Sequence, residues 1–108
     1  MTRVATMDDW SQLEGSFQAH CEKMGWNFST NFEPVVKKIL ESETKEGFCI
    51  LAEREKEVCG FIIVTYEWSD WRNGFMLWFQ AVDAKDDEAA QCLKDKLFEV
   101  SKSGELKY

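Results

Sequence analysis

The feature that most restricts the fold is a segment in which both alternating sets of residues are apolar. In "EVCGFIIVTYEW" (57–68), Phe61 and Ile63 fall on one side of an extended chain. Ile62 and Val64 fall on the other side, because successive side chains of a strand point to opposite faces. A strand with two apolar faces belongs in the middle of a sheet that has helices above and below it. The sequence therefore predicts an α/β fold built in layers.

Three further segments have strand character. "TRVAT" (2–6) can form a short first strand, and "GFCILAE" (47–53) precedes the central strand across a charged turn around "REK". "FMLWFQAV" (75–82) follows the central strand, and Asn73-Gly74 supplies turn chemistry before it. We therefore expect 57–68 and 75–82 to pair as an antiparallel hairpin.

A helix is predicted to begin near Met7, because Thr6 followed by Asp9 matches the capping signal [ST]xx[DE]. It should end at Gly25. Its apolar stripe consists of Trp10, Leu13, Phe17, Cys21 and Met24. His20 lies beside this stripe, and we expect it to be satisfied or exposed rather than catalytic, because nothing nearby would tune it.

Two more helices follow the same reasoning. In "WNFSTNFEPVVKKILES" (26–42), the candidate caps are Ser29, Thr30 and Asn31, and Pro34 fits the first turn. The predicted buried face is Phe32, Val35, Val36, Ile39 and Leu40. Before it, Trp26 and Phe28 either pack on the sheet, which we favour, or border a site. From Asp86 the period is again helical, with Ala89, Leu93, Leu97 and Val100 on one face and Gly104 as the C-cap. "ELKY" after it could begin one more short strand.

Composition limits the class of protein. With 108 residues, 44% of them hydrophobic and 31% charged, residues 1–108 should form a single soluble domain. The net charge of −7 gives nucleic acid no electrostatic footprint. No apolar segment suits a signal or a membrane span, and the four cysteines form no CxxC pair. We therefore expect no metal, no membrane contact and a reducing, cytoplasmic location.

The order strand, helix, helix, three strands, helix, together with "GFIIVTYEWSDWRNG" and "WFQAV", resembles the N-terminal part of the GNAT superfamily of acetyl-CoA-dependent N-acetyltransferases. The resemblance runs from the first strand to about Val82, and its specific part lies between Gly60 and Val82. It implies a truncated GNAT-like fold, with a central, mostly antiparallel sheet and helices on both faces.

The resemblance also implies a site. In the family, backbone groups of the fourth strand hold the pantetheine arm of acetyl-CoA, and the matching cofactor-binding residues are Phe79, Gln80, Ala81, Val82 and Asp83. An amine, small or on a protein, would be the substrate. The candidate catalytic residues are Glu67, which would take the proton of the amine, and Asp70. Trp68 and Trp71 could bind a cationic acceptor by cation–π contact. Alternatively, these charged residues pair locally in a tight turn and the Trp residues pack over it.

The chain departs from the family at the phosphate loop, which normally reads R/Q-x-x-G-x-G/A. Here the loop is "DAKDDEAA", with neither glycine nor arginine between Gly74 and Gly104. We expect Asp86, Asp87 and Glu88 to cap the following helix with their own carboxylates. Losing two or three hydrogen bonds to phosphate costs roughly 3–9 kcal/mol, or at least about a hundredfold in acetyl-CoA affinity.

The second departure is at the C-terminal side, because the chain stops at Tyr108, near where the family's fifth strand would begin. An uncovered sheet edge would then favour a homodimer, or a separate chain that supplies the missing half. Two functions follow from the sequence. The first is a GNAT-like N-acetyltransferase with an altered cofactor site. The alternative is a non-catalytic relative that self-associates or binds a partner.

Overall fold

The computed structural model describes residues 1–43, 45–69 and 74–103, and it gives residues 66–69, 74–79 and 101–103 by their backbone alone. The elements run in the predicted order. They are β1 (Thr2–Val4), a 3-10 turn (Met7–Asp9), α1 (Trp10–Met24), a π turn (Phe28–Phe32), α2 (Glu33–Glu41), β2 (Gly47–Arg54), β3 (Glu57–Ser69), β4 (Gly74–Ala84) and α3 (Asp87–Ser103). The predicted C-cap at Gly104 and the last strand lie outside the described residues.

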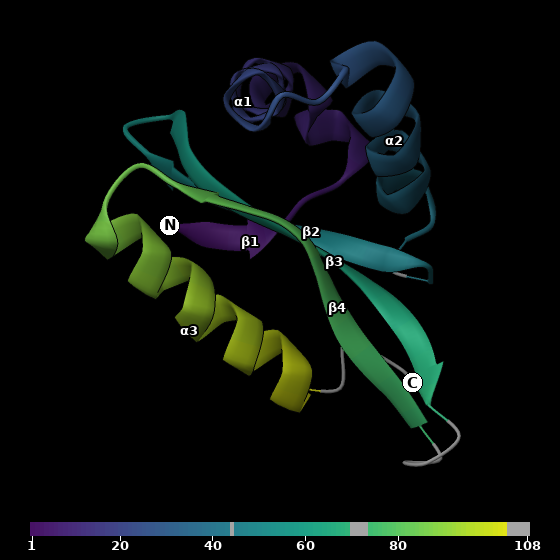
Figure 1. Cartoon of the computed structure of the whole chain (residues 1–108). Helices are drawn as coiled ribbons and strands as arrows, with labels where there is room; N and C mark the ends of the chain where they lie inside the picture. The colour runs from purple at the N-terminus through teal and green to yellow at the C-terminus, as the bar shows by residue number, and fades with distance from the viewer. Residues whose placement is uncertain (44, 70–73, 104–108) are drawn as a thin grey trace.

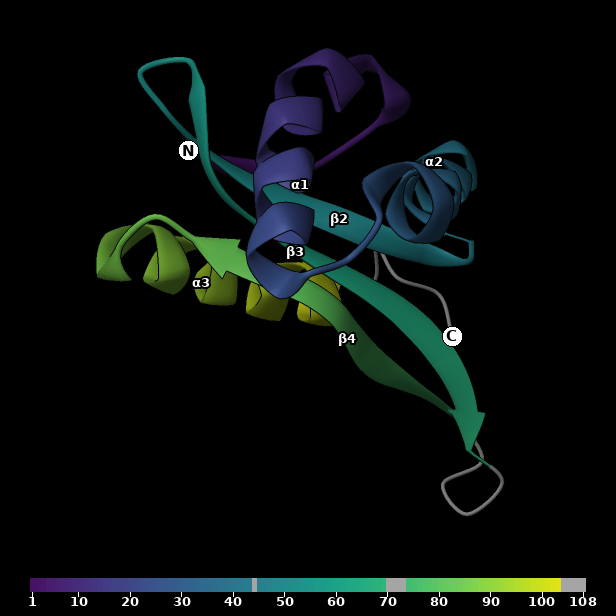
Figure 2. The same ribbon diagram turned by 45° about the horizontal axis from the view of Figure 1, so that its top comes forward.

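The sheet has the order β1-β2-β3-β4, and each neighbouring pair is antiparallel. Helices α1 and α2 cover one face of the sheet, and α3 covers the other (Figure 1). This arrangement confirms the α/β fold class and the β3–β4 hairpin. Seen from a second direction, the far end of the hairpin runs beyond the helices (Figure 2). In the described part of the chain, no helix is long and apolar enough to cross a membrane.

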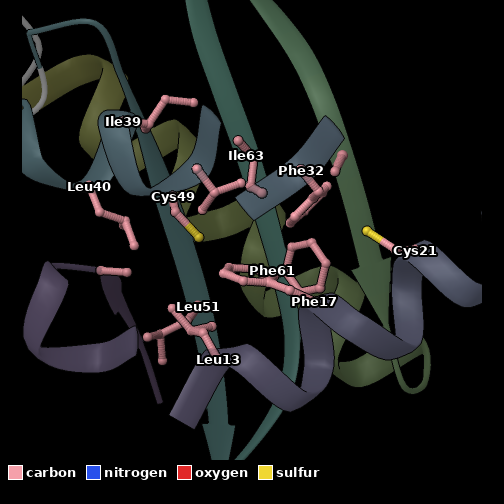
Figure 3. Packing of buried hydrophobic residues seen from close by; sticks show 13 residues of the cluster. Leu13, Phe17, Cys21, Phe32, Ile39, Leu40, Cys49, Leu51, Phe61 and Ile63 are labelled. Atoms are coloured by element: carbon pink, nitrogen blue, oxygen red, sulfur yellow. The ribbon is translucent and has the colours of Figure 1, made fainter. Parts of the chain in front are cut away.

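The core has two halves, one on each face of the sheet. Phe61 and Ile63 of β3 lie in the half under α1 and α2, where Phe17 and Leu13 join them (Figure 3). Their sequence neighbours on β3 lie in the half under α3 with Leu93. The two apolar faces expected of the central strand are therefore both buried, as predicted.

A β-bulge interrupts the pairing of β3 with β4. Ile63 pairs with Ala81, but the next residue of β3, Val64, pairs with Phe79. Gln80 is consequently an extra residue that has no counterpart on β3. A bulge bends its strand and re-aims the side chains around it, and bulges are common next to active sites.

Two residues predicted for the buried helix faces are exposed. Met24 has 49% of its surface accessible, because it lies in the last turn of α1, where the chain leaves the helix at Gly25. Val35 is 51% exposed, whereas Val36 is buried. Consecutive helical residues are turned about 100° apart, so Val36 faces the sheet and Val35 points to its side.

The helix starts also differ in detail from the prediction. The Thr6 backbone N–H donates to the Asp9 carboxylate at 2.8 Å, as the capping signal predicts, but the first turn is a 3-10 turn and the α-helix begins at Trp10. Before α2 the cap is Asn27, whose side chain accepts from the backbone N–H of Thr30 at 2.9 Å. The three predicted caps lie inside the π turn, because Asn27 starts the helical path earlier. Pro34 lies in the first turn, as expected.

Candidate functional site at the β4 bulge

The bulge lies in a strand at the edge of the sheet. Among the described elements, β4 pairs with β3 on one side and ends the sheet on the other. The bulged residue Gln80 is exposed, and its amide nitrogen donates to the Thr65 hydroxyl at 2.9 Å. This bond turns the Gln80 amide toward the face of the sheet that α1 and α2 cover. The backbone along the free side of β4 can therefore bind an extended ligand.

A hollow of about 290 Å³ opens beside the bulge. Its walls come from the α1–α2 connection, from α2 and from strands β3 and β4, and they include Trp26, Asn31, Phe32, Val36, Ile63 and Gln80. Apolar walls with two amide side chains suit an apolar ligand that carries a single polar group. Trp26, 40% exposed, therefore borders this hollow, whereas Phe28 packs against the core. We refer to the hollow as the aromatic pocket.

His20 is buried beside the aromatic pocket, with 4% of its surface exposed. Its ring lies edge-on to Trp26 and to Phe61, with centroids 5.4 Å apart in both pairs. Its Nδ1 lies 2.8 Å from a carboxylate oxygen of Asp83. Nothing near His20 in the sequence indicates this partner, because Asp83 is 63 residues away and only the fold brings it near.

Asp83 is held from two sides. Besides His20, the Lys23 ammonium lies 3.4 Å from the same carboxylate oxygen. Desolvation by burial works to raise the pKa of Asp83, but the hydrogen bonds from His20 and Lys23 outweigh it and hold this pKa below its ordinary value. Asp83 is therefore ionised at neutral pH, and its oxygen accepts a hydrogen bond from the Nδ1–H of His20.

The other ring nitrogen of His20 is unpaired. His20 Nε2 is buried and has no hydrogen-bond partner within the described residues. A neutral histidine that donates from Nδ1 leaves Nε2 with a free lone pair. A buried polar atom without a partner is costly, and in native proteins it calls for an explanation.

The start of α3 is closed by carboxylates. Asp86 accepts from the Ala89 N–H at 2.9 Å, and Arg54 donates to its two oxygens at 2.7 and 3.0 Å. The hydrogen bond from Arg54 is the main reason that the pKa of Asp86 lies well below its ordinary value, and the bond from Ala89 adds to it. Capping by Asp86 is thus confirmed. The carboxylate of Glu88 lies 3.9 Å from Arg54.

These residues do not fit the diphosphate of acetyl-CoA. A phosphate binds a helix N-terminus through free N–H groups and the positive end of the helix dipole. Here a carboxylate already bonds the first turn, and Arg54 is committed to it. The fit is better at the bulge, where the free side of β4 suits the extended arm of a thioester.

The remaining predicted residues are spread along the hairpin. Ala81 is buried, Val82 is 53% exposed toward the α3 side, and Phe79 pairs with Val64 through its backbone. Glu67 and Trp68 pair with Met76 and Phe75, inside β3 rather than beyond its end. Glu67 is four positions from Ile63, or about 13 Å along the strand. Asp70 and Trp71 lie outside the described residues.

Cys21 and Cys49 are poor candidates for catalysis. Burial raises the pKa of the Cys49 thiol far above its ordinary value, and it also raises the pKa of Cys21. A buried thiol of raised pKa is a poor nucleophile. Among the described residues, no group of three His, Cys, Asp or Glu side chains could hold a metal ion.

Comparison with known proteins places this fold. No protein-family model matches the sequence, and a search of the curated proteins finds no match. Among solved structures, a possible acetyltransferase from Clostridium difficile 630 is 28% identical, with a TM-score of 0.66 over 95% of this chain and 68% of that one. A GNAT family acetyltransferase from Staphylococcus aureus subsp. aureus USA300_TCH1516 is 17% identical, with a TM-score of 0.73 over 99% and 81%.

A third match is the ribosomal-protein-alanine N-acetyltransferase from Brucella melitensis biovar Abortus 2308. It is 9% identical, with a TM-score of 0.73 over 99% of this chain and 74% of that one. The resemblance inferred from the sequence is therefore confirmed at the level of the fold. The chain has the fold of the GNAT acetyltransferases and is smaller than their full domain.

Proposed function

We propose that the protein is a GNAT-like N-acetyltransferase that transfers an acetyl group from acetyl-CoA to a primary amine. The observation that carries the proposal is the bulge at Gln80. It lies on an edge strand, directly beside an aromatic pocket large enough for an amine substrate. A bulge there leaves backbone groups of β4 available to a thioester arm on one side and turns Gln80 toward the pocket on the other.

The proposed roles follow the strand. Phe79 and the four residues after it hold the pantetheine arm through the free side of the β4 backbone. Gln80 orients the acceptor from the edge of the pocket. Glu67, Asp70, Trp68 and Trp71 keep the roles of proton acceptor and acceptor-binding residues as predictions from the sequence.

The carboxylate cap at the start of α3 leads to a specific prediction about the affinity for the acetyl donor. If Asp86 blocks the diphosphate position, the nucleotide part of acetyl-CoA adds little to binding, and the pantetheine arm supplies most of the affinity. S-acetylpantetheine, which lacks the nucleotide, should then bind within about tenfold of acetyl-CoA. In an enzyme with an intact phosphate loop the difference would be at least about a hundredfold.

Calorimetry on the purified chain with both thioesters tests the proposal. Micromolar acetyl-CoA binding, followed by acetylation in a screen of amines, is the expected result. A well-folded chain that gives no heat with either thioester at millimolar concentration would show that no acetyl donor binds, and it would contradict the proposed acetyltransferase activity.

A matched pair of variants tests the fit at α3. Asp86→Asn keeps a good helix cap but removes the charge, so acetyl-CoA should bind about tenfold more tightly or better, while S-acetylpantetheine is unchanged. Asp95→Asn removes the same charge from an exposed position of α3 that bonds Gln91. It should change neither affinity.

The second candidate is a non-catalytic module that self-associates. Two observations favour it: the carboxylate cap on α3, and the absence of any charged residue from 74 to 82 of the edge strand. Natural proteins usually protect exposed edges with charges or short strands. Pairing of β4 with β4 of a second copy would cover both edges by one symmetric contact. The mass in solution tests this candidate, and a monomer at micromolar concentration would contradict it.

A further inference from the structure

The unexplained group in this molecule is His20, whose Nε2 is buried without a partner beside the aromatic pocket. Two neighbours of its ring, Trp26 and Phe32, are walls of that pocket. On the sheet below, Phe61 lies under the ring, and Ile63 lies in the pocket floor. Phe61 and Ile63 are two positions apart on β3, which corresponds to about 6–7 Å along the strand. Glu67 is four positions from Ile63 and therefore lies about twice as far from it.

Asp83 determines which nitrogen of His20 can accept a proton. Its carboxylate accepts from Nδ1 at 2.8 Å, and Lys23 holds the same carboxylate in place. A carboxylate on Nδ1 fixes the tautomer in which Nε2 carries the lone pair, and it stabilises the imidazolium that forms when Nε2 takes up a proton. Lys23 and Asp83 are the charged groups bonded into this cluster. Three aromatic rings, those of Trp26, Phe32 and Phe61, also lie against the imidazole.

We infer that His20 accepts the proton of a primary amine that carries an apolar arm and binds in the aromatic pocket. The inference rests on the proposed amine acetylation. The N–H bond of the bound ammonium breaks, and its proton forms the Nε2–H bond of His20. The electron pair stays on the amine nitrogen, which becomes neutral and nucleophilic. The positive charge moves to the imidazolium beside Asp83. The apolar arm follows from the pocket walls.

Trp26 is the side chain that gives the amine access to His20. It follows Gly25, which ends α1 in the left-handed conformation with φ 75°. Its indole is 40% exposed, lines the pocket and lies edge-on to the His20 ring, with centroids 5.4 Å apart. We expect a rotation of this side chain to admit the amine to Nε2.

The test uses the full chain and an advantage of its sequence, which contains a single histidine. In a ¹⁵N-labelled sample, the imidazole signals of a long-range ¹H–¹⁵N spectrum belong to His20 alone. At pH 7.5 we expect a protonated Nδ1 and a bare Nε2. Asp83→Asn should shift the population toward the Nε2–H tautomer, and Asp87→Asn, on α3, should not. A free protein with the proton on Nε2, or a tautomer that ignores Asp83→Asn, overturns the inference.

Titration with an amine then tests recognition. Benzylamine binds as its ammonium ion, so it should donate an N–H hydrogen bond to Nε2 and shift the Nε2 signal saturably. Benzyltrimethylammonium has the same charge and ring but no N–H proton, so it should leave Nε2 bare. Equal responses to both cations, or a response to neither, contradict proton transfer to His20.

Acetyl-CoA calorimetry on the same sample separates the two proposals. A saturable benzylamine response without acetyl-CoA binding would support the amine site at His20 and contradict the proposed acetyltransferase. Acetyl-CoA binding without a benzylamine response would support the proposed acetyltransferase and contradict the amine site at His20. With an active acceptor in hand, His20→Gln should lower kcat about a hundredfold or more at unchanged acetyl-CoA affinity, because a general base contributes that much. A loss with Glu67→Gln but not with His20→Gln would assign the proton to Glu67 instead.

Discussion

Asp83, near the end of β4, and Asp86, just before α3, lie three residues apart, and each has a pKa below its ordinary value. Their surroundings differ. Asp83 turns into the layer under α1 and meets a buried histidine. Asp86 stays at the surface, where a bidentate arginine and a backbone N–H satisfy its oxygens.

The two carboxylates differ in whether their bonding partner keeps a polar atom without a partner of its own. Asp86 bonds an exposed arginine and a backbone N–H, so the cap stabilises the start of α3 and repels an anion. Asp83 passes its effect on to His20, whose far nitrogen has no partner among the described residues. An unpaired ring nitrogen therefore lies beside the aromatic pocket, while a carboxylate occupies the start of α3.

The largest effect should come from removing the floor of the buried site. Phe61 is fully buried, and its ring lies edge-on to Phe17 at 4.9 Å and to His20 at 5.4 Å. Phe61→Ala should lower the free energy of unfolding by about 3–5 kcal/mol, because it leaves a cavity under both rings. Urea denaturation measures this. Met24→Ala, at a side chain that is 49% exposed, is the control and should cost below about 1 kcal/mol.

Removing the charge of Asp83 should have the next largest effect. Asp83→Asn weakens the bonds from His20 and Lys23, so we expect a loss of about 1–3 kcal/mol at pH 7. Asp87→Asn, at an exposed position of α3, should change the urea midpoint little. Equal midpoints for both variants would show that the buried pair contributes nothing to stability.

The pH dependence of stability should follow both carboxylates. Because each pKa is lower in the folded chain, the unfolded chain binds more protons under acidic conditions. The stabilisation is thus complete above the unfolded pKa of about 4 and is lost as the pH falls through the folded pKa values. Urea midpoints between pH 2.5 and 7 should decline less steeply in Asp83→Asn than in the parent chain. Identical slopes would contradict the lowered pKa of Asp83.

The smallest effect should be the response to salt, which distinguishes the two carboxylates directly. Arg54→Gln removes the exposed partner of Asp86, so it should lower the thermal midpoint slightly in dilute buffer and hardly at all in 1 M NaCl, where charges are screened within about 3 Å. The effect of Asp83→Asn should persist in 1 M NaCl, because the His20 contact is buried. An Arg54→Gln effect that also persists would mean that this pair acts through packing.

The sequence predicted the elements well because their signals are local. Alternating apolar residues in 57–68 and the helical period after Asp86 each depend on neighbours along the chain. Asp86 as a cap was predictable for the same reason, since a cap bonds an N–H three residues ahead. Val35 was misplaced because its spacing suits the apolar stripe, and only packing decides which side of the stripe meets the sheet.

The bulge at Gln80 and the pair of His20 with Asp83 were decided by the tertiary structure. A bulge is a difference in count between two strands, so neither strand shows it alone. His20 carries no sequence signal of its role, because its partner is 63 residues away on another element. The sequence by itself determined the layers, the strand order along the chain and the acidic start of α3, which depend on short-range chemistry. The pairing of His20 with Asp83 beside the aromatic pocket depends instead on tertiary packing, because only the folded sheet and helices bring these distant side chains within hydrogen-bond distance.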